Sequence, residues 1–181
     1  PLPEKKLAEV LPETHAHPER EGLEGLLLRA LRAHGNGEWQ LAVELYGQVL
    51  ELRPDDRLAS IVFNHRGMAW FVVRESARAL EDFTRALEHN PDNYRALNNR
   101  SLVWRLWGQR ERALADLERS EQIRPRQADV HWNRALVLSD RGDRVAALRE
   151  LEEVLTVEPD HARARELRES LARALFDGSK A

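Results

Sequence analysis

Asparagine and arginine recur on the same turn of three segments that otherwise look like apolar helices. The segments are "FNHRGMAW" (63–70), "LNNRSLVW" (97–104) and "WNRALVL" (132–138). Asparagine is a poor helix former, because its side chain competes with the backbone for hydrogen bonds. Its amide offers two donors and an acceptor, enough to hold both the C=O and the N–H of one residue in an extended peptide. The pattern therefore predicts either recognition of a peptide main chain or a structural tie between helices.

The elements that must position these residues repeat along the chain. Four prolines are separated by 37, 34 and 34 positions: Pro54, Pro91, Pro125 and Pro159. Twelve positions before each proline lies an alanine: Ala42, Ala79, Ala113 and Ala147. Twelve positions earlier lies another small residue: Ala30, Gly67, Ser101 or Ala135. Small residues in this register let two helices approach closely, so each period predicts a pair of packed helices.

Signals for helix ends follow the same register. Five positions before the alanines stand Gly37, Arg74, Gly108 and Gly142, and glycine is the residue expected where a helix stops and turns. Each proline ends a second helix, and acidic residues after it can cap the next one: Asp55 or Asp56, Asp92, and Asp160. The sequence therefore predicts repeated helix–turn–helix units, which gain stability by stacking on one another.

This pattern resembles the tetratricopeptide repeat, a 34-residue helix–turn–helix unit. The resemblance covers about residues 23–161 and is strongest in "GMAWFVVRESARALEDFTRALEHNPDN". There the family's characteristic positions are filled by Gly67, Trp70, Ala79, Phe83, Ala86 and Pro91. The chain departs from the strict consensus at Arg66, Arg100 and Arg134, which stand where the family has leucine. Asparagine followed by arginine is a common variant in bacterial members, so a bacterial type of short array is expected.

The resemblance implies an all-α fold, a right-handed α-solenoid of about four units followed by a C-terminal capping helix. Each unit should pack mainly on its neighbours. The expected boundaries are an N-terminal extension with a possible short helix (1–19), a divergent first unit (20–56), three further units (57–93, 94–127 and 128–161), the capping helix (162–176) and a tail (177–181).

In tetratricopeptide proteins one face of each first helix lines a concave groove. The resemblance places these residues on that face: Asn64, His65, Met68, Phe71, Arg95, Asn98, Asn99, Leu102, Arg105, Trp132, Asn133 and Leu136. Some superhelical members use a ladder of asparagines to hold a peptide main chain whatever its sequence. The alternative is that these asparagines only tie neighbouring helices together.

The carboxylate clamp of chaperone-binding members is a different groove chemistry, and the sequence does not fit it. Of the five positions that the clamp requires, only Asn99 carries the matching residue. Binding of a chaperone's acidic C-terminus by that route is not expected. Arg95 and Arg105 could still attract an acidic ligand.

Composition and motifs exclude several other classes of function. The net charge of −3 offers no concentrated basic surface for nucleic acid, and there is no cysteine for a disulfide or a thiolate metal site. No run approaches the roughly 18 apolar residues of a membrane helix. No phosphate loop or activated nucleophile is present, and neither a metal site nor a cofactor is expected. A non-enzymatic, cytoplasmic protein is therefore expected.

Two hypotheses for function follow. The first is an interaction scaffold that binds a protein or an extended peptide in the groove. The second is a structural module that forms a homodimer through apolar surfaces of the N-terminal segment and of the first unit, where Leu27, Leu28 and Leu31 would otherwise be exposed to water. The N-terminal segment around Leu7, Val10 and Leu11, or a second molecule, is expected to cover that face. The sequence leaves open whether the protein is a monomer or a homodimer.

Overall fold

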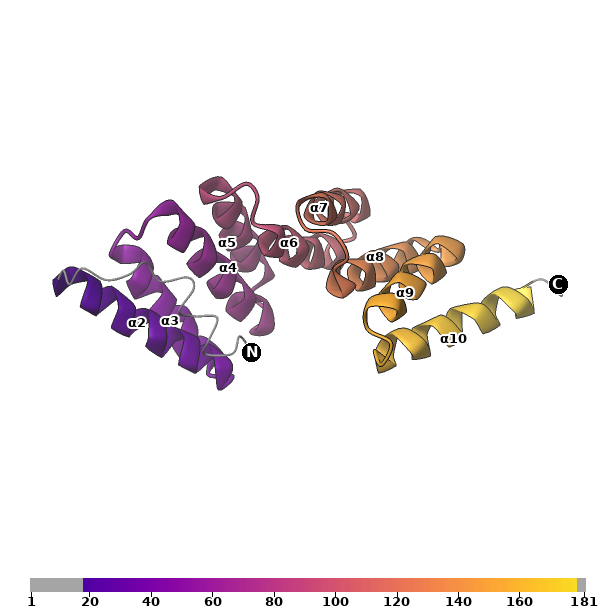
Figure 1. Cartoon of the computed structure of the whole chain (residues 1–181), viewed down its shortest axis with the longest axis horizontal. Helices are drawn as coiled ribbons and strands as arrows, with labels where there is room; N and C mark the ends of the chain where they lie inside the picture. The colour runs from indigo at the N-terminus through magenta and orange to yellow at the C-terminus, as the bar shows by residue number, and fades with distance from the viewer. Residues whose placement is uncertain (1–17, 179–181) are drawn as a thin grey trace. The chain divides into compact units, whose positions relative to one another are not determined.

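The computed structural model describes the backbone of residues 18–178 and the side chains of residues 22–175 (Figure 1). Within this part of the chain every regular element is an α-helix, which confirms the all-α prediction. The helices are α2 (Pro18–Gly35), α3 (Trp39–Glu51), α4 (Asp56–Val72), α5 (Ser76–His89), α6 (Tyr94–Leu106), α7 (Arg110–Ile123), α8 (Ala128–Arg141), α9 (Arg144–Val157) and α10 (Ala162–Gly178). No helix among these residues is long and apolar enough to cross a membrane.

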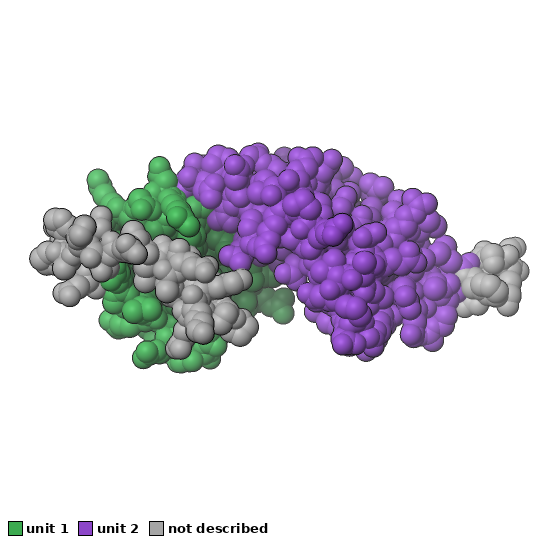
Figure 2. All heavy atoms as spheres, viewed as in Figure 1, with its two compact units in different colours: residues 1–82 green, residues 83–181 purple. Residues whose placement is uncertain are grey.

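The chain divides into two compact units, Pro1–Asp82 and Phe83–Ala181, which Figure 2 colours separately. In the first unit, α3 packs against both α2 and α4. Its core joins alanines of α2 and α3 to larger side chains: Leu27, Ala30, Ala33, Ala42, Leu45, Tyr46, Val49 and Val62. The segment around Leu7, Val10 and Leu11 lies outside the described residues. Of the three leucines expected to need a cover, Leu27 belongs to this core and Leu28 is 51% exposed.

In the second unit, α6 packs on α7 and α8 packs on α9, while α10 packs on α9. The residues predicted to make close helix contacts are buried here, including Ser101, Ala113, Ala135 and Ala147. Ala164 and Leu171 of α10 join the core of the α8–α9 pair. This is the role predicted for a capping helix, because α10 covers apolar surface that the last pair would expose.

All four predicted turns contain a residue in the left-handed region: Gly37, Arg74, Gly108 and Gly142, with φ of 77°, 69°, 70° and 86°. Each turn also makes the same two backbone hydrogen bonds. In the second turn, for example, the Arg74 N–H donates to the Phe71 carbonyl and the Glu75 N–H donates to the Trp70 carbonyl. The prediction of a helix stop is therefore confirmed even at Arg74, although a side chain is disfavoured at positive φ.

The predicted caps were correct in position to within one residue but not always in identity. The Asp55 carboxylate accepts from the Leu58 N–H at 2.8 Å, as expected. At α6 the cap is Asn93, whose side chain accepts from the Ala96 N–H, and not Asp92. At α10 the Ala164 N–H donates to His161 Nδ1, and not to Asp160.

The arginines that depart from the family consensus clasp the two helices of each pair together. Arg66 of α4 donates from Nε and Nη2 to the Asp82 carboxylate of α5, at 2.8 and 2.7 Å. Arg100 of α6 makes the same pair of bonds to Asp116 of α7, again at 2.8 and 2.7 Å. Both carboxylates are buried. In each clasp the hydrogen bonds between arginine and aspartate therefore replace those that the two side chains make to water in the unfolded chain.

The clasp is weaker in the α8–α9 pair and absent from the first pair. Arg134 Nε lies 3.6 Å from Glu150, whose carboxylate also contacts His131 Nδ1 at 2.8 Å. In the first pair, Arg29 is exposed, and the position sixteen residues later holds the buried Leu45. The α2–α3 pair is therefore held by apolar packing.

The first unit also contains a cluster of rings: His34, Trp39, Tyr46 and His65. His34 lies edge-on to Trp39 at 4.9 Å and to His65 at 5.4 Å between ring centroids. His65 stacks on Tyr46 at 5.9 Å. Among the described residues, His34 Nδ1 and the Tyr46 hydroxyl are buried without a hydrogen-bond partner. Burial lowers the pKa of His34 and raises the pKa of Tyr46.

Removing one partner of a clasp should cost more stability than removing both. Asp116→Ala leaves the Arg100 guanidinium in a mostly buried site without its carboxylate, so we expect a loss of about 2–4 kcal/mol. The double variant Arg100→Leu/Asp116→Ala places the family's leucine at position 100. Its free energy of unfolding should fall by less than half of the loss expected for Asp116→Ala. Urea unfolding of both variants measures the difference, and equal losses would contradict the interpretation.

Arg74→Gly should stabilise the protein. A left-handed backbone costs a residue with a side chain about 1–2 kcal/mol, whereas the greater freedom of glycine in the unfolded chain offsets about 0.5–1 kcal/mol. We expect a net gain of about 0.5–1 kcal/mol in thermal or urea unfolding. Gly108→Ala is the matched control, since a Cβ there meets no atom within 4 Å and tests the backbone alone. It should destabilise, and a gain from both changes would refute the argument.

Acid should destabilise the first unit through His34. Because folding lowers the pKa of this residue, the unfolded chain binds more protons as the pH falls below about 6.5. The stability that the protein gains from neutral His34 is therefore fully present above about pH 6.5 and is lost as the pH falls toward the lowered pKa of this residue. His34→Phe removes the titrating ring, so its melting temperature should fall less than that of the wild type between about pH 7 and 5. Identical pH profiles would contradict this.

Candidate functional site

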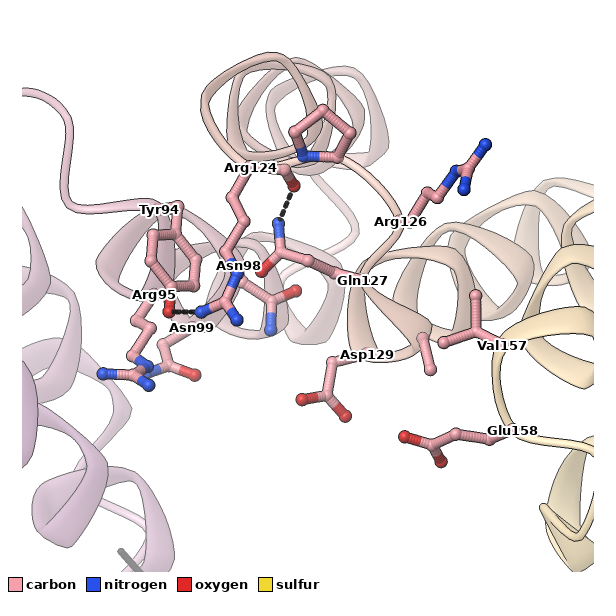
Figure 3. Close-up of a pocket in the computed structure, with 12 residues that line it drawn as sticks. Tyr94, Arg95, Asn98, Asn99, Arg124, Arg126, Gln127, Asp129, Val157 and Glu158 are labelled. Carbon is pink, nitrogen blue, oxygen red and sulfur yellow. Dashed lines mark hydrogen bonds between the residues drawn. The ribbon is translucent and has the colours of Figure 1, made fainter. Parts of the chain in front are cut away.

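A hollow of about 430 Å³ opens in the second unit beside α6. Its walls come from the start of α6, the segment that joins α7 to α8, the first turn of α8 and the end of α9 (Figure 3). The lining residues are Tyr94, Arg95, Asn98, Asn99, Arg124, Pro125, Arg126, Gln127, Ala128, Asp129, Val157 and Glu158. Three residues predicted for the groove, Arg95, Asn98 and Asn99, are therefore brought together in one site.

A hydrogen bond between two asparagines joins α6 to α8 next to this hollow. Asn133 Nδ2 donates to Asn98 Oδ1 at 2.9 Å, and Asn133 is only 7% exposed. The main-chain carbonyl of Asn98 accepts from the Ser101 hydroxyl at 2.6 Å. No described residue accepts a hydrogen bond from Asn98 Nδ2. One amide thus orients the other and leaves its two N–H donors available at the hollow.

One wall of the hollow is cationic and is organised around Tyr94. The guanidinium carbons of Arg95 and Arg124 lie 5.3 and 5.0 Å from the centroid of the Tyr94 ring. Arg124 Nη1 also donates to the Tyr94 hydroxyl. Contact with a ring face restrains both cations without neutralising them. Neither guanidinium has a carboxylate partner among the described residues.

The connection that carries Arg124 is itself held in place. Gln127 Nε2 donates to the Arg124 carbonyl at 2.6 Å, and the Ser120 hydroxyl donates to the Tyr94 carbonyl at 2.9 Å. The backbone N–H of Arg126 donates to Glu121 Oε1 at 2.8 Å, while the Arg126 side chain points away from Asn98 and Asn99 (Figure 3). The Ser120–Tyr94 bond ties α7 to α6, and the other two bonds fix the α7–α8 segment, so the cationic wall does not need a ligand for its shape.

The opposite side of the hollow is acidic. Asp129 lies in the first turn of α8 and Glu158 follows the end of α9, and Figure 3 shows both across the gap from Arg95 and Asn99. Both are exposed, and neither has a cationic partner among the described residues. Val157, 41% exposed, adds an apolar contact beside them.

The other predicted groove residues of the second unit do not line the hollow. Arg105 Nε donates to the Asp140 carboxylate at 2.6 Å, which joins the ends of α6 and α8. The Trp132 ring packs on the core of the last helices, 5.1 Å from the His161 ring and with Arg163 over its face at 5.0 Å. Leu102 and Leu136 are partly buried.

The predicted groove residues of the first unit all lie on α4. Asn64 is buried at 6% exposure, and His65 belongs to the ring cluster described above. Met68 and Phe71 are partly buried. Their assignment to a binding surface stays a prediction.

Sequence reasoning missed the residues that come from the start of a helix or from the connections between helices. Tyr94, Arg124 and Glu158 do not belong to the periodic face of a first helix, so the period of 34 gave no reason to choose them. One local signal was present: Arg124 immediately precedes Pro125, at the end of a second helix. No group of three or more His, Asp or Glu side chains in the described part of the chain could hold a metal ion.

Comparison with known proteins gives a family match and many structural matches. The tetratricopeptide-repeat family model matches residues 66–128. No curated protein matches the chain by sequence. YrrB, described as a tetratricopeptide protein with an unusual peptide-binding site, is similar in structure with a TM-score of 0.67 and 18% identity over 77% of this chain and 71% of that one.

Two further solved structures are similar over about two thirds of this chain. The first tetratricopeptide domain of Spaghetti (RPAP3), bound to the HSP90 peptide SRMEEVD, matches with a TM-score of 0.63 and 18% identity over 66% of this chain and 94% of that one. The tetratricopeptide domain of Sgt2 from Aspergillus fumigatus matches with a TM-score of 0.63 and 22% identity over 67% and 82%. At these identities the likeness establishes the fold. Residues 66–128 therefore carry the sequence pattern of the tetratricopeptide repeat, and the described helices have the fold of tetratricopeptide-repeat proteins.

Proposed function

We propose that this protein is a non-catalytic interaction module that binds an extended segment of a protein partner in the hollow beside α6. The observation that carries the proposal is the position of Asn98 and Asn99, adjacent amides that line a preformed cavity. The structural relatives described as binding peptides make a peptide the natural class of ligand.

The asparagines would hold the main chain of the bound segment. Asn98 already accepts from Asn133, so its two N–H donors are directed by a bond that ligand binding does not need to break. A peptide carbonyl could accept from Asn98 Nδ2, and Asn99 would extend the grip to the next peptide unit. Each such bond adds about 0.5–1.5 kcal/mol, so a few of them contribute substantially to micromolar binding, about −8 kcal/mol in total.

In this proposal Asn133 supports binding indirectly. Its side chain is buried and its Nδ2 is used by Asn98, so it orients a contact residue. In place of a full asparagine ladder, Asn98 and Asn99 would contact the peptide, and Asn133 would hold Asn98 in position. On this proposal, Asn98 and Asn99 serve recognition, whereas Asn133 ties two helices together.

The test is selection of random 12-residue peptides displayed on phage by the immobilised full-length protein. We expect the wild type to retain specific peptides, and Asn98→Ala/Asn99→Ala to bind them about tenfold more weakly, because two or more hydrogen bonds are lost. Fluorescence anisotropy of the synthetic peptides measures the change in dissociation constant. Circular dichroism and thermal melting establish that the variant is folded.

Gln122→Ala is the matched control, since it removes an exposed amide from α7 that does not line the hollow. It should leave affinity unchanged. Equal binding of the selected peptides by the wild type and the double asparagine variant would overturn the proposed site. Retention of no peptide at all would overturn the proposed function.

A further inference from the structure

We propose that the hollow selects peptide segments that carry both an acidic and a basic side chain. This inference rests on the proposed function and names the class of segment that the same site would accept. It starts from the charges on the two walls, which the asparagine contacts do not use.

The cationic wall is ready to receive a carboxylate. Other arginines of these helices already have acidic partners, as Arg100 has Asp116 and Arg105 has Asp140. Arg95 and Arg124 are instead held against the Tyr94 ring, and no described carboxylate pairs with either. Restraint by the ring lowers the entropy that the two long side chains lose when an anion binds. A planar guanidinium also matches a carboxylate with two parallel hydrogen bonds.

The acidic side of the hollow is ready to receive a cation. Asp129 and Glu158 have no cationic partner among the described residues, although guanidinium groups line the same hollow. The opposite charges therefore face one gap without closing it by a salt bridge. Since Val157 is the last residue of α9 and directly precedes Glu158, the stem of a lysine or arginine would find an apolar contact beside the carboxylate that pairs with its head.

A ligand of one charge sign would satisfy one wall and be repelled by the other. An all-acidic segment would bring carboxylates toward Asp129 and Glu158, and an all-basic segment would bring cations toward Arg95 and Arg124. A segment with both signs meets complementary charge on each side, while Asn98 and Asn99 hold the main chain between them. The walls thereby supply selection that the main-chain contacts lack.

The first part of the test is the composition of the peptides selected from the random library. We expect enrichment of sequences that contain both an acidic and a basic residue, and binding that weakens as ionic strength rises. Enrichment of acidic residues alone, of basic residues alone, or of neither would overturn this inference. Such results would leave the proposed function intact if binding still required Asn98 and Asn99, whereas retention of no peptide would overturn both.

The second part assigns each charge to its wall. Replacing the acid of a selected peptide by its amide should weaken wild-type binding about three- to tenfold, and replacing its base by methionine should do the same. Replacing the peptide's acid should not weaken its binding to Arg95→Gln/Arg124→Gln any further. Replacing the peptide's base should likewise not weaken its binding to Asp129→Asn/Glu158→Gln. Equal sensitivity of the wild type and both variants would overturn the assignment.

The matched controls are Arg112→Gln and Glu118→Gln, exposed residues of α7 that do not line the hollow. They change the net charge by the same sign as the site variants, so they separate local pairing from general electrostatic attraction. Both controls should retain the full sensitivity of the wild type to each peptide change. Loss of that sensitivity in a control would assign the effect to overall charge and refute the proposal.

Discussion

In the α6–α7 pair, the ion pair between Arg100 and Asp116 fixes which face of α6 points toward α7, and the position of the hollow depends on it. Arg100 points toward α7 because Asp116 accepts two hydrogen bonds from it there. Successive residues of a helix point about 100° apart, so Asn99 and Asn98 face away from α7 when Arg100 faces it, and both line the hollow. A buried charge is tolerated only when it is paired, so a small rotation of α6 about its axis would cost the clasp as well as the packing around Ser101.

Charged side chains are paired within the protein in the clasp, whereas those at the hollow are not. In the clasp, a bidentate geometry and burial satisfy both ions within one pair of helices. At the hollow, Arg95 and Arg124 are restrained by an aromatic ring, which holds a cation in place but leaves its charge uncompensated. Exposed charges of this kind add little to folding stability, because water already solvates them. Their arrangement around a cavity therefore has more consequence for what can bind than for how the protein folds.

The sequence predicted the parts of the fold that depend on local repetition. The small residues and the left-handed turns recur at spacings of 37, 34 and 34, and both are set by contacts within one helix pair, so they could be predicted without coordinates. Arg66 and Arg100 were noted only as departures from leucine, although each has an aspartate sixteen residues later. That spacing has no meaning until the turn between the helices is fixed. The hollow was harder to predict, because Arg124 and Glu158 come from connections whose direction no periodic pattern specifies.

The bond between Asn133 and Asn98 explains how a structural tie can also prepare a binding site. An asparagine side chain has one acceptor oxygen and two N–H donors, and the bond from Asn133 uses only the oxygen of Asn98. Pairing across two helices fixes the plane of the Asn98 amide and thereby the direction of the remaining donors. A peptide carbonyl that meets them does not compete with the protein's own hydrogen bond, and little side-chain entropy is left to lose. The main-chain grip would then supply affinity for any extended segment, and the oppositely charged walls would decide which segments stay.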